Sequence, residues 1–340
     1  MSTPDQTPLP QTALRTFERS CCPVTSAQAE IIAASVFGIT GQASELYGEC
    51  DQNFRLTTDA ETYLFKVSHE AEDQSVTDLQ TQILTYLSKQ NAALAIPTVI
   101  LARNGQPQAR WTSSDGVTRA LRLTSFLPGS AFEDRAASQD ELRNTGLAMA
   151  RLAMALRDFR HPAEDRELLW DVQNVHRLRP MLKCLANPDH QNVAATVLDV
   201  FEKTALPQMH SLRRQMIHND INRGNILMSP AGAVTGIIDF GDAVRAPLIQ
   251  DLAVCGAYHV AEEGDPMANI RVVVDSYETI LPLYADEKAL LPILVASRMA
   301  MSLLIAAWRH TFNPDPDTQA TSDRAVVGLG RLLQAAKILP

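Results

Sequence analysis

The residues best suited to chemistry lie in one short segment, where Asp220 and Asn225 stand in the pattern His-x-Asp-x-x-x-x-Asn that begins at His218. A second carboxylate follows downstream, in Asp239-Phe-Gly. Phosphoryl transfer from a nucleotide requires a carboxylate that faces the attacking hydroxyl. It also requires an amide and a second carboxylate that hold Mg²⁺ on the phosphates. The two motifs supply these groups in this order. We therefore predict that Asp220 accepts the hydroxyl proton and that Asn225 and Asp239 bind Mg²⁺.

Three further polar residues near these motifs are expected to have supporting roles. We expect His218 to brace the catalytic loop through hydrogen bonds. We expect Asp251 to brace a loop or to lie at the start of a helix. Asp242 comes directly after the Asp239-Phe-Gly motif, and both a water-mediated metal contact and a structural hydrogen bond are open for it.

The chain around the motifs must bring these side chains together, and its pattern predicts a β-hairpin that does so. Short apolar runs over residues 214–218, 225–228 and 234–238 predict strands, and the Pro and Gly of Ser229–Gly232 predict a turn. The catalytic loop then precedes the hairpin, and the metal-binding carboxylate follows it. Kinase-type active sites have this arrangement.

The rest of the chain changes character near residue 127. Before it, the pattern predicts helices over 26–37 and 75–90 and strands over 43–47, 53–57, 62–67, 98–103, 110–111 and 119–126. After it, the pattern predicts helices over 141–159, 180–185, 193–212, 249–260, 270–280 and 289–311. We therefore predict an α+β, two-lobed, protein-kinase-like fold with an antiparallel β N-lobe and a mainly helical C-lobe. Residues 1–25 are expected to be flexible, 26–126 to bind the nucleotide, and 127–340 to form the catalytic and substrate-binding lobe.

The chain resembles the aminoglycoside phosphotransferase/choline kinase superfamily, and within it most closely the hydroxylysine kinases. The resemblance extends from Val36 to Arg298, so it covers most of the chain. Its matching stretches are Val36–Gly38, Asp51–Phe54, Tyr63–Ser68, Leu79–Ile83, Arg122–Gly129, Phe159–Pro162, Trp170–Val175, Gly236–Asp242 and Ser297-Arg298.

The resemblance implies how the nucleotide is bound. Lys66, in a strand of alternating apolar residues, would reach the α- and β-phosphates and serve catalysis; the alternative is a solvent-facing lysine. Gln80 occupies the position of the glutamate that usually orients this lysine, with Glu70 or Glu72 as substitutes. The loop from Tyr47 to Asn53 would cover the phosphates through backbone amides and through Gln52 or Asn53; the alternative is a plain polar hairpin.

The connector between the lobes would bind the base through its backbone, at Ser125, Phe126 and Leu127. Backbone recognition discriminates poorly between adenine and guanine. Hydroxylysine kinases use GTP, so the resemblance leaves ATP and GTP both open as phosphoryl donors, with Mg²⁺.

The acceptor is expected to be a small hydroxylated molecule. The segment from Asp242 to Asp251 is too short for the activation segment of protein kinases, and no Ala-Pro-Glu follows. Arg298 interrupts an apolar helical face and must be paired, either with a substrate carboxylate or with an internal acid such as Asp242 or Glu262. The expected pocket residues are Arg298, Trp170 and Asp242, with Asn174, His176, Trp308 and Arg309 as further candidates; the tryptophans fit the core as well.

The bulk properties favour a protein that acts on small molecules in the cytoplasm. The net charge of −9 without a Lys/Arg cluster argues against nucleic acid or an anionic membrane as a partner. Five cysteines without a C-x-x-C pair indicate reduced thiols, and no signal peptide is evident. The apolar stretch 289–307 is interpreted as a buried helix. Monomer and homodimer are both open.

Two alternatives to a hydroxylysine kinase remain. A sibling kinase for homoserine, methylthioribose, choline or an aminoglycoside would keep the catalytic residues and differ in the acceptor pocket. An inactive nucleotide-binding pseudokinase would normally lack one of Lys66, Asp220, Asn225 or Asp239, and all four are present.

Overall fold

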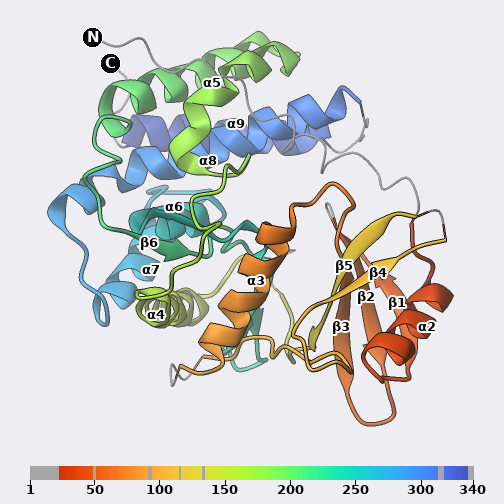
Figure 1. Ribbon diagram of the computed structural model, residues 1–340. Coiled ribbons are helices and arrows are strands. Elements are labelled where there is room, and N and C mark those ends of the chain that lie inside the picture. The colour runs from red at the N-terminus through yellow and green to blue at the C-terminus, as the bar shows by residue number, and fades with distance from the viewer. Residues whose placement is uncertain are drawn as a thin grey trace.

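The computed structural model describes residues 23–48, 51–90, 94–114, 116–131, 135–312 and 318–335. The part before residue 127 is built around one antiparallel sheet, and the part after it is mainly helical (Figure 1). Most of the segment expected to be flexible, residues 1–22, lies outside the described residues. Val24 and Thr25 belong to the fold, because Val24 is buried and Thr25 caps the first described helix.

The sheet has five antiparallel strands in the order β1-β2-β3-β5-β4. Helix α2 (Ser26–Val36) covers one face of it (Figure 1), where Phe65 and Val67 are buried. Because side chains alternate along a strand, Leu64 and Lys66 point to the opposite face. The strands are β1 (Gln42–Leu46), β2 (Gln52–Thr57), β3 (Thr62–Val67), β4 (Ala109–Thr112) and β5 (Thr118–Ser125).

Helix α3 (Gln74–Leu87) lies between the sheet and the helical part (Figure 1). Its Leu79, Ile83 and Leu87 are buried in the main hydrophobic core, which is formed largely by the helical part. The free energy of burying these side chains holds α3 against the catalytic half of the molecule.

The helical part packs around the long helix α8 (Ala285–His310), which contacts η1, α5, α6 and α9. Two short antiparallel strand pairs, β6–β9 and β7–β8, flank the catalytic loop. The other elements are α4 (Gln139–Leu156), the 3₁₀ helix η1 (Val172–Cys184), α5 (Pro188–Val200), the π-turn η2 (Phe201–Ala205), β6 (Arg214–Ile217), β7 (Ile226–Met228), β8 (Val234–Ile237), η3 (Phe240–Asp242), β9 (Val244–Pro247), α6 (Ile249–Ala257), α7 (Ala268–Glu278) and α9 (Thr318–Ala335).

The expected strand over residues 98–103 is wrong, and the reason is competition for one sheet edge. Strand β4 pairs with the first half of β5, up to Leu121. Only a single bridge, between Val99 and Thr124, joins the 98–103 segment to the remaining half. Backbone hydrogen bonds from Ile100 to Leu123 and from Ser125 to Thr98 hold it there.

Other differences concern short elements and element ends. The helix expected over 180–185 is the end of a 3₁₀ helix that starts at Val172, capped by Asp171. The helix expected over 193–212 begins at Pro188 and gives way to a π-turn at Phe201. Strand β9, which pairs with β6, and helix α9 were not expected.

Helix α8 is long and apolar enough to cross a membrane by length and composition. However, 78% of its most apolar window is buried inside the protein. It also carries the buried Arg298. The helix is therefore a core element, in agreement with its interpretation from the sequence.

Candidate active site

The catalytic loop between β6 and β7 is fixed by a buried carboxylate from α6. Asp251 accepts hydrogen bonds from the backbone amides of His218, at 3.1 Å, and Asn219, at 2.6 Å. Asn219 has a left-handed backbone, with φ of 66°, a conformation that non-glycine residues adopt only when neighbours hold it. Burial raises the pKa of Asp251, and the two amide donors oppose that rise. Asp251 is thus the loop brace that the sequence suggested.

His218 braces the loop from the other side, as predicted. Its Nδ1 accepts a hydrogen bond from the Asp220 amide at 3.3 Å, which leaves Nε2 to donate to the Ile238 carbonyl at 2.9 Å. This network assigns Nδ1 as the acceptor and Nε2 as the donor. The ring also lies against Phe240, with centroids 4.6 Å apart. His218 therefore links the catalytic loop to the segment that carries Asp239.

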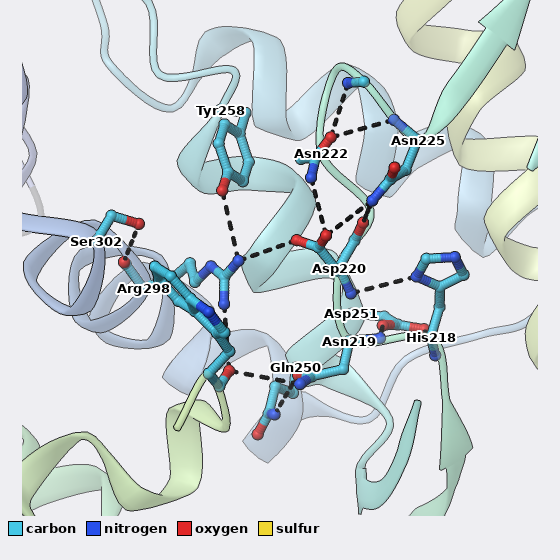
Figure 2. A network of polar contacts seen from close by, with 12 residues as sticks. His218, Asn219, Asp220, Asn222, Asn225, Gln250, Asp251, Tyr258, Arg298 and Ser302 are labelled. Carbon is cyan, nitrogen blue, oxygen red and sulfur yellow. Dashed lines mark hydrogen bonds and ion pairs between the residues drawn. The ribbon is translucent and has the colours of Figure 1, made fainter. Parts of the chain in front are cut away.

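Asp220 is held by three side chains (Figure 2). Its Oδ2 accepts hydrogen bonds from the amides of Asn225, at 2.7 Å, and Asn222, at 2.9 Å. Its Oδ1 lies 3.0 Å from a guanidinium nitrogen of Arg298. The side chain nevertheless remains 21% exposed. The carboxylate is thus oriented by neutral donors on one oxygen and a cation on the other, with room for an acceptor hydroxyl.

Arg298 is paired inside the protein, and its acidic partner is Asp220 rather than Asp242 or Glu262. The guanidinium also donates to the Trp170 carbonyl at 3.2 Å and lies 4.7 Å from the centre of the Trp170 ring. A longer contact, of 3.4 Å, joins it to the Tyr258 hydroxyl. Of the three predicted acceptor residues, Arg298 thus lies next to Asp220 (Figure 2), and Trp170 lies against Arg298.

Asp242, the third predicted acceptor residue, lies at the end of η3. It is close enough to Arg298 to favour the charged form of the guanidinium electrostatically. It acts in the same way on Arg166. Its role in binding the acceptor stays a prediction.

The two predicted metal ligands offer oxygen atoms of the kind that Mg²⁺ prefers. Asn225 uses its amide nitrogen on Asp220, which leaves its amide oxygen for a metal. Asp239 has a left-handed backbone, with φ of 58°, and its side chain is 48% exposed. In the described part of the chain no cluster of three His, Cys, Asp or Glu residues could hold a metal. A site with one carboxylate, one amide, phosphates and water fits Mg²⁺ bound with a nucleotide.

Lys66 lies in a pocket between the sheet and the metal-binding segment. Its Nζ is 3.7 Å from Asp239 and 3.6 Å from Asp51. The proximity of Lys66 lowers the pKa of Asp239, so this carboxylate is ionised at neutral pH. Residues that line the pocket are Leu64, Lys66, Gln80, Leu84, Pro97, Arg122, Thr124, Asp239, Phe240 and Gly241.

The residue expected to orient Lys66, Gln80, contacts another group instead. Gln80 donates to the Gly241 carbonyl at 3.2 Å, so it supports the segment that follows Asp239. Arg166 donates to the same carbonyl and to that of Ala243. Besides Asp239, the acid next to Lys66 is Asp51, the residue directly before β2. Its other oxygen accepts a hydrogen bond from the His69 amide at 2.9 Å.

Gln52 and Asn53 take different positions in the predicted phosphate loop. Asn53 lies opposite Lys66 in the β2–β3 register and therefore shares its face. Gln52 points to the other face, where it exchanges two hydrogen bonds with the Val24 backbone. Its expected nucleotide contact is therefore wrong. Gly48 lets this loop close, because a Cβ atom there would lie 2.1 Å from the Asp51 carbonyl oxygen.

The connector offers the base fewer donors than expected. The Ser125 amide donates to the Thr98 carbonyl and the Phe126 amide to the Thr62 carbonyl. Among the described residues, the Leu127 amide has no backbone acceptor. Of the three expected residues, Leu127 is the one whose amide is available to a base.

The sequence interpretation missed Asp51, Arg122, Arg166 and Asn222 as members of the site. Two of them had a local signal. Asn222 lies inside the catalytic motif, and Asp51 lies inside the loop expected to cover the phosphates. The two arginines come from distant segments. Arg122 belongs to a stretch of the family resemblance, which gave it no role.

Comparison with known proteins agrees with this geometry. The model of the "Phosphotransferase enzyme family" matches residues 46–286, which is most of the chain. The chain belongs to this family. Hydroxylysine kinase of Mus musculus is 28% identical over 319 residues, covering 86% of this chain and 84% of the mouse protein. Homoserine kinase of Neisseria meningitidis is 26% identical over 248 residues, covering 72% and 75%.

Solved structures confirm the kinase-like fold. A microcompartment-associated aminopropanol kinase superposes with a TM-score of 0.73 at 17% identity, covering 93% of this chain and 99% of the other. An amicoumacin kinase in complex with AMP-PNP and Ca²⁺ superposes with a TM-score of 0.71 at 15% identity, covering 90% and 93%. This phosphotransferase is therefore a two-lobed small-molecule kinase with an antiparallel N-lobe and a helical C-lobe, as predicted.

The first prediction concerns the metal. Replacing Asp239 by Ala should remove the Mg²⁺-dependent part of nucleotide binding, because it takes away the carboxylate of the metal site. Thermal-shift titrations with ATP and GTP, with and without Mg²⁺, measure this. Asp78→Asn is the control, since this exposed carboxylate on α3 pairs with His161. A Mg²⁺-dependent shift that survives in Asp239→Ala contradicts the metal role.

Proposed function

We propose that this kinase transfers the γ-phosphoryl group of ATP or GTP to the hydroxyl of 5-hydroxy-L-lysine or a similar hydroxylated amino acid. The observation that carries the proposal is the position of Asp220. On one side it contacts Asn225, a candidate metal ligand, and on the other it contacts Arg298, which is stacked on Trp170. A hydroxyl there would meet the phosphoryl donor, and the rest of the acceptor would meet the arginine.

In this proposal each residue of the site has a separate role in the reaction. Asp220 accepts the proton of the attacking hydroxyl, and its two amide neighbours keep one of its oxygens in a fixed position. Lys66 orients and neutralises the α- and β-phosphates. Asn225 and Asp239 would hold Mg²⁺, which neutralises charge on the transferred group.

Arg298 favours an acceptor with a carboxylate. Its guanidinium is buried, and its Nε has no hydrogen-bond partner in the described part of the chain. A carboxylate on that edge would satisfy this donor with a charge-assisted hydrogen bond. Asp242, close to Arg298 in electrostatic terms, would complement an ammonium group. An amino acid with a hydroxylated side chain carries all three groups.

Homoserine is the second candidate, because it has the same carboxylate, ammonium and hydroxyl, and homoserine kinases are among the relatives. Choline and aminoglycosides are cations without a carboxylate. A buried guanidinium 3.0 Å from the catalytic carboxylate disfavours them. All four residues whose loss marks an inactive kinase are in place, which argues against a pseudokinase.

The proposal is tested with a panel of acceptors, each assayed with ATP and with GTP in the presence of Mg²⁺. We expect 5-hydroxy-L-lysine to be phosphorylated on its hydroxyl. L-lysine should be inert because it offers no hydroxyl nucleophile, and it is the matched control. Phosphorus NMR of the product identifies the phosphorylated position. Faster turnover of homoserine, choline or an aminoglycoside would contradict the proposed acceptor while leaving the kinase mechanism intact.

A further prediction separates the two contacts of Arg298. Arg298→Met should lower kcat, because Asp220 loses the cation on Oδ1, and should raise KM for hydroxylysine, because the carboxylate loses its partner. Each change should be roughly tenfold to a hundredfold. Tyr258→Phe removes only the 3.4 Å contact and is the control.

The nucleotide KM should stay within about twofold of wild type in Arg298→Met, since Arg298 is not among the residues that line the Lys66 pocket. A fall in kcat with an unchanged hydroxylysine KM would show that Arg298 only positions Asp220. Unchanged kcat and KM together would contradict both roles.

A further inference from the structure

Two cations line the nucleotide pocket side by side. Lys66 on β3 and Arg122 on β5 are directly opposed in the antiparallel register, and both line the pocket. Like charges in opposed positions repel each other. Burial strengthens that repulsion, and only 15% of the Lys66 side chain and 8% of the Arg122 side chain are exposed. This pair of cations therefore does not stabilise the sheet.

The protein compensates this charge only in part. Asp51 is shared between the two cations, 3.6 Å from Lys66 and 3.7 Å from Arg122, and both distances are beyond hydrogen-bond range. Asp239 also attracts both, but it is the candidate metal ligand. Two donor nitrogens of Arg122, Nε and Nη2, have no hydrogen-bond partner among the described residues. Buried donors without acceptors cost free energy, which a ligand with suitable acceptors can recover.

We propose that Arg122 binds phosphate oxygens of the donor nucleotide beside Lys66. The guanidinium presents a planar fork of donors that matches two phosphate oxygens, whereas the lysine contributes a compact point charge. Until the phosphates bind, Asp51 offsets part of the repulsion between the two cations. The proposal rests on the nucleotide half of the proposed function and is independent of the acceptor.

If Arg122 had a purely structural role, we would expect it to make different contacts. An arginine that braces the sheet would use its donors on protein oxygens, as Arg166 does on two carbonyls. Arg122 instead has its closest described anion at 3.7 Å. Burial lowers its pKa, and the surrounding carboxylates oppose that change. An anionic ligand would relieve the cost of keeping this group charged.

The test compares ligands with and without phosphates on Arg122→Met and Arg122→Lys. Isothermal titration calorimetry with Mg²⁺ measures the affinities for ADP, adenosine, GDP and guanosine. Arg122→Met should weaken the affinity for the diphosphate that wild type binds by roughly tenfold to a hundredfold. The affinity for the corresponding nucleoside should stay within about twofold of wild type. The diphosphate affinity of Arg122→Lys should lie between those of wild type and Arg122→Met, because lysine keeps the charge and lacks the planar fork of donors. Mg²⁺ tripolyphosphate should raise the melting temperature of wild type more than that of Arg122→Met.

Arg119→Met is the matched control on the same strand. Arg119 is buried and pairs with Glu70 at 3.3 Å, so its loss should lower the melting temperature of the free protein and spare ADP affinity. Arg122→Met should leave that temperature unchanged or raise it. Equal weakening of nucleotide and nucleoside, or diphosphate affinity within about twofold of wild type, overturns the proposal. The proposal is also overturned if the wild-type protein binds neither ADP nor GDP. Failure to phosphorylate hydroxylysine, with the selective loss intact, overturns only the proposed acceptor.

Discussion

The hydrogen bonds from the amides of His218 and Asn219 to the buried Asp251 are the contact on which the site depends. They tie the catalytic loop to α6, and they hold Asn219 in a left-handed conformation that directs the chain toward Asp220. The left-handed turn and the buried carboxylate both cost free energy, and each is tolerated because the other is present. The position of the catalytic carboxylate is therefore set by the packing of α6 within the helical core.

A second constraint is the balance of charge around the phosphates. Lys66 and Arg122 face Asp51 and Asp239, which offset part of the positive charge before any ligand binds. A metal at Asp239 would remove one negative charge from this set and leave the cations to the phosphates. The same principle operates at Asp220, the proposed proton acceptor, where Arg298 places a cation beside the carboxylate. Both halves of the site thus pair a carboxylate with a buried cation from a distant segment.

The catalytic motif was predictable because its parts are local in sequence. Asp220, Asn225 and His218 lie within one loop, and the alternation around Lys66 identifies its face of a strand. What the sequence could not provide were partners that only the tertiary structure brings together. Arg122 on β5 lies opposite Lys66 across the β3–β5 pair, and no local pattern indicates this contact. Asp51 lies in the loop that was expected to cover the phosphates, but its contact with Lys66 was not expected. The strand expected over 98–103 failed for the same reason, because propensity does not say which segment takes the edge of β5.

The most direct test of the account is the role of Asp220, measured with the best acceptor of the panel. Asp220→Asn keeps the size of the side chain and removes its capacity to take a proton. Turnover and nucleotide affinity should be measured on the same preparation. We expect kcat to fall by roughly 10² to 10⁴-fold while the dissociation constant of the Mg²⁺ nucleotide stays within about twofold of wild type. A kcat close to that of wild type would contradict the assignment of Asp220 as the proton acceptor.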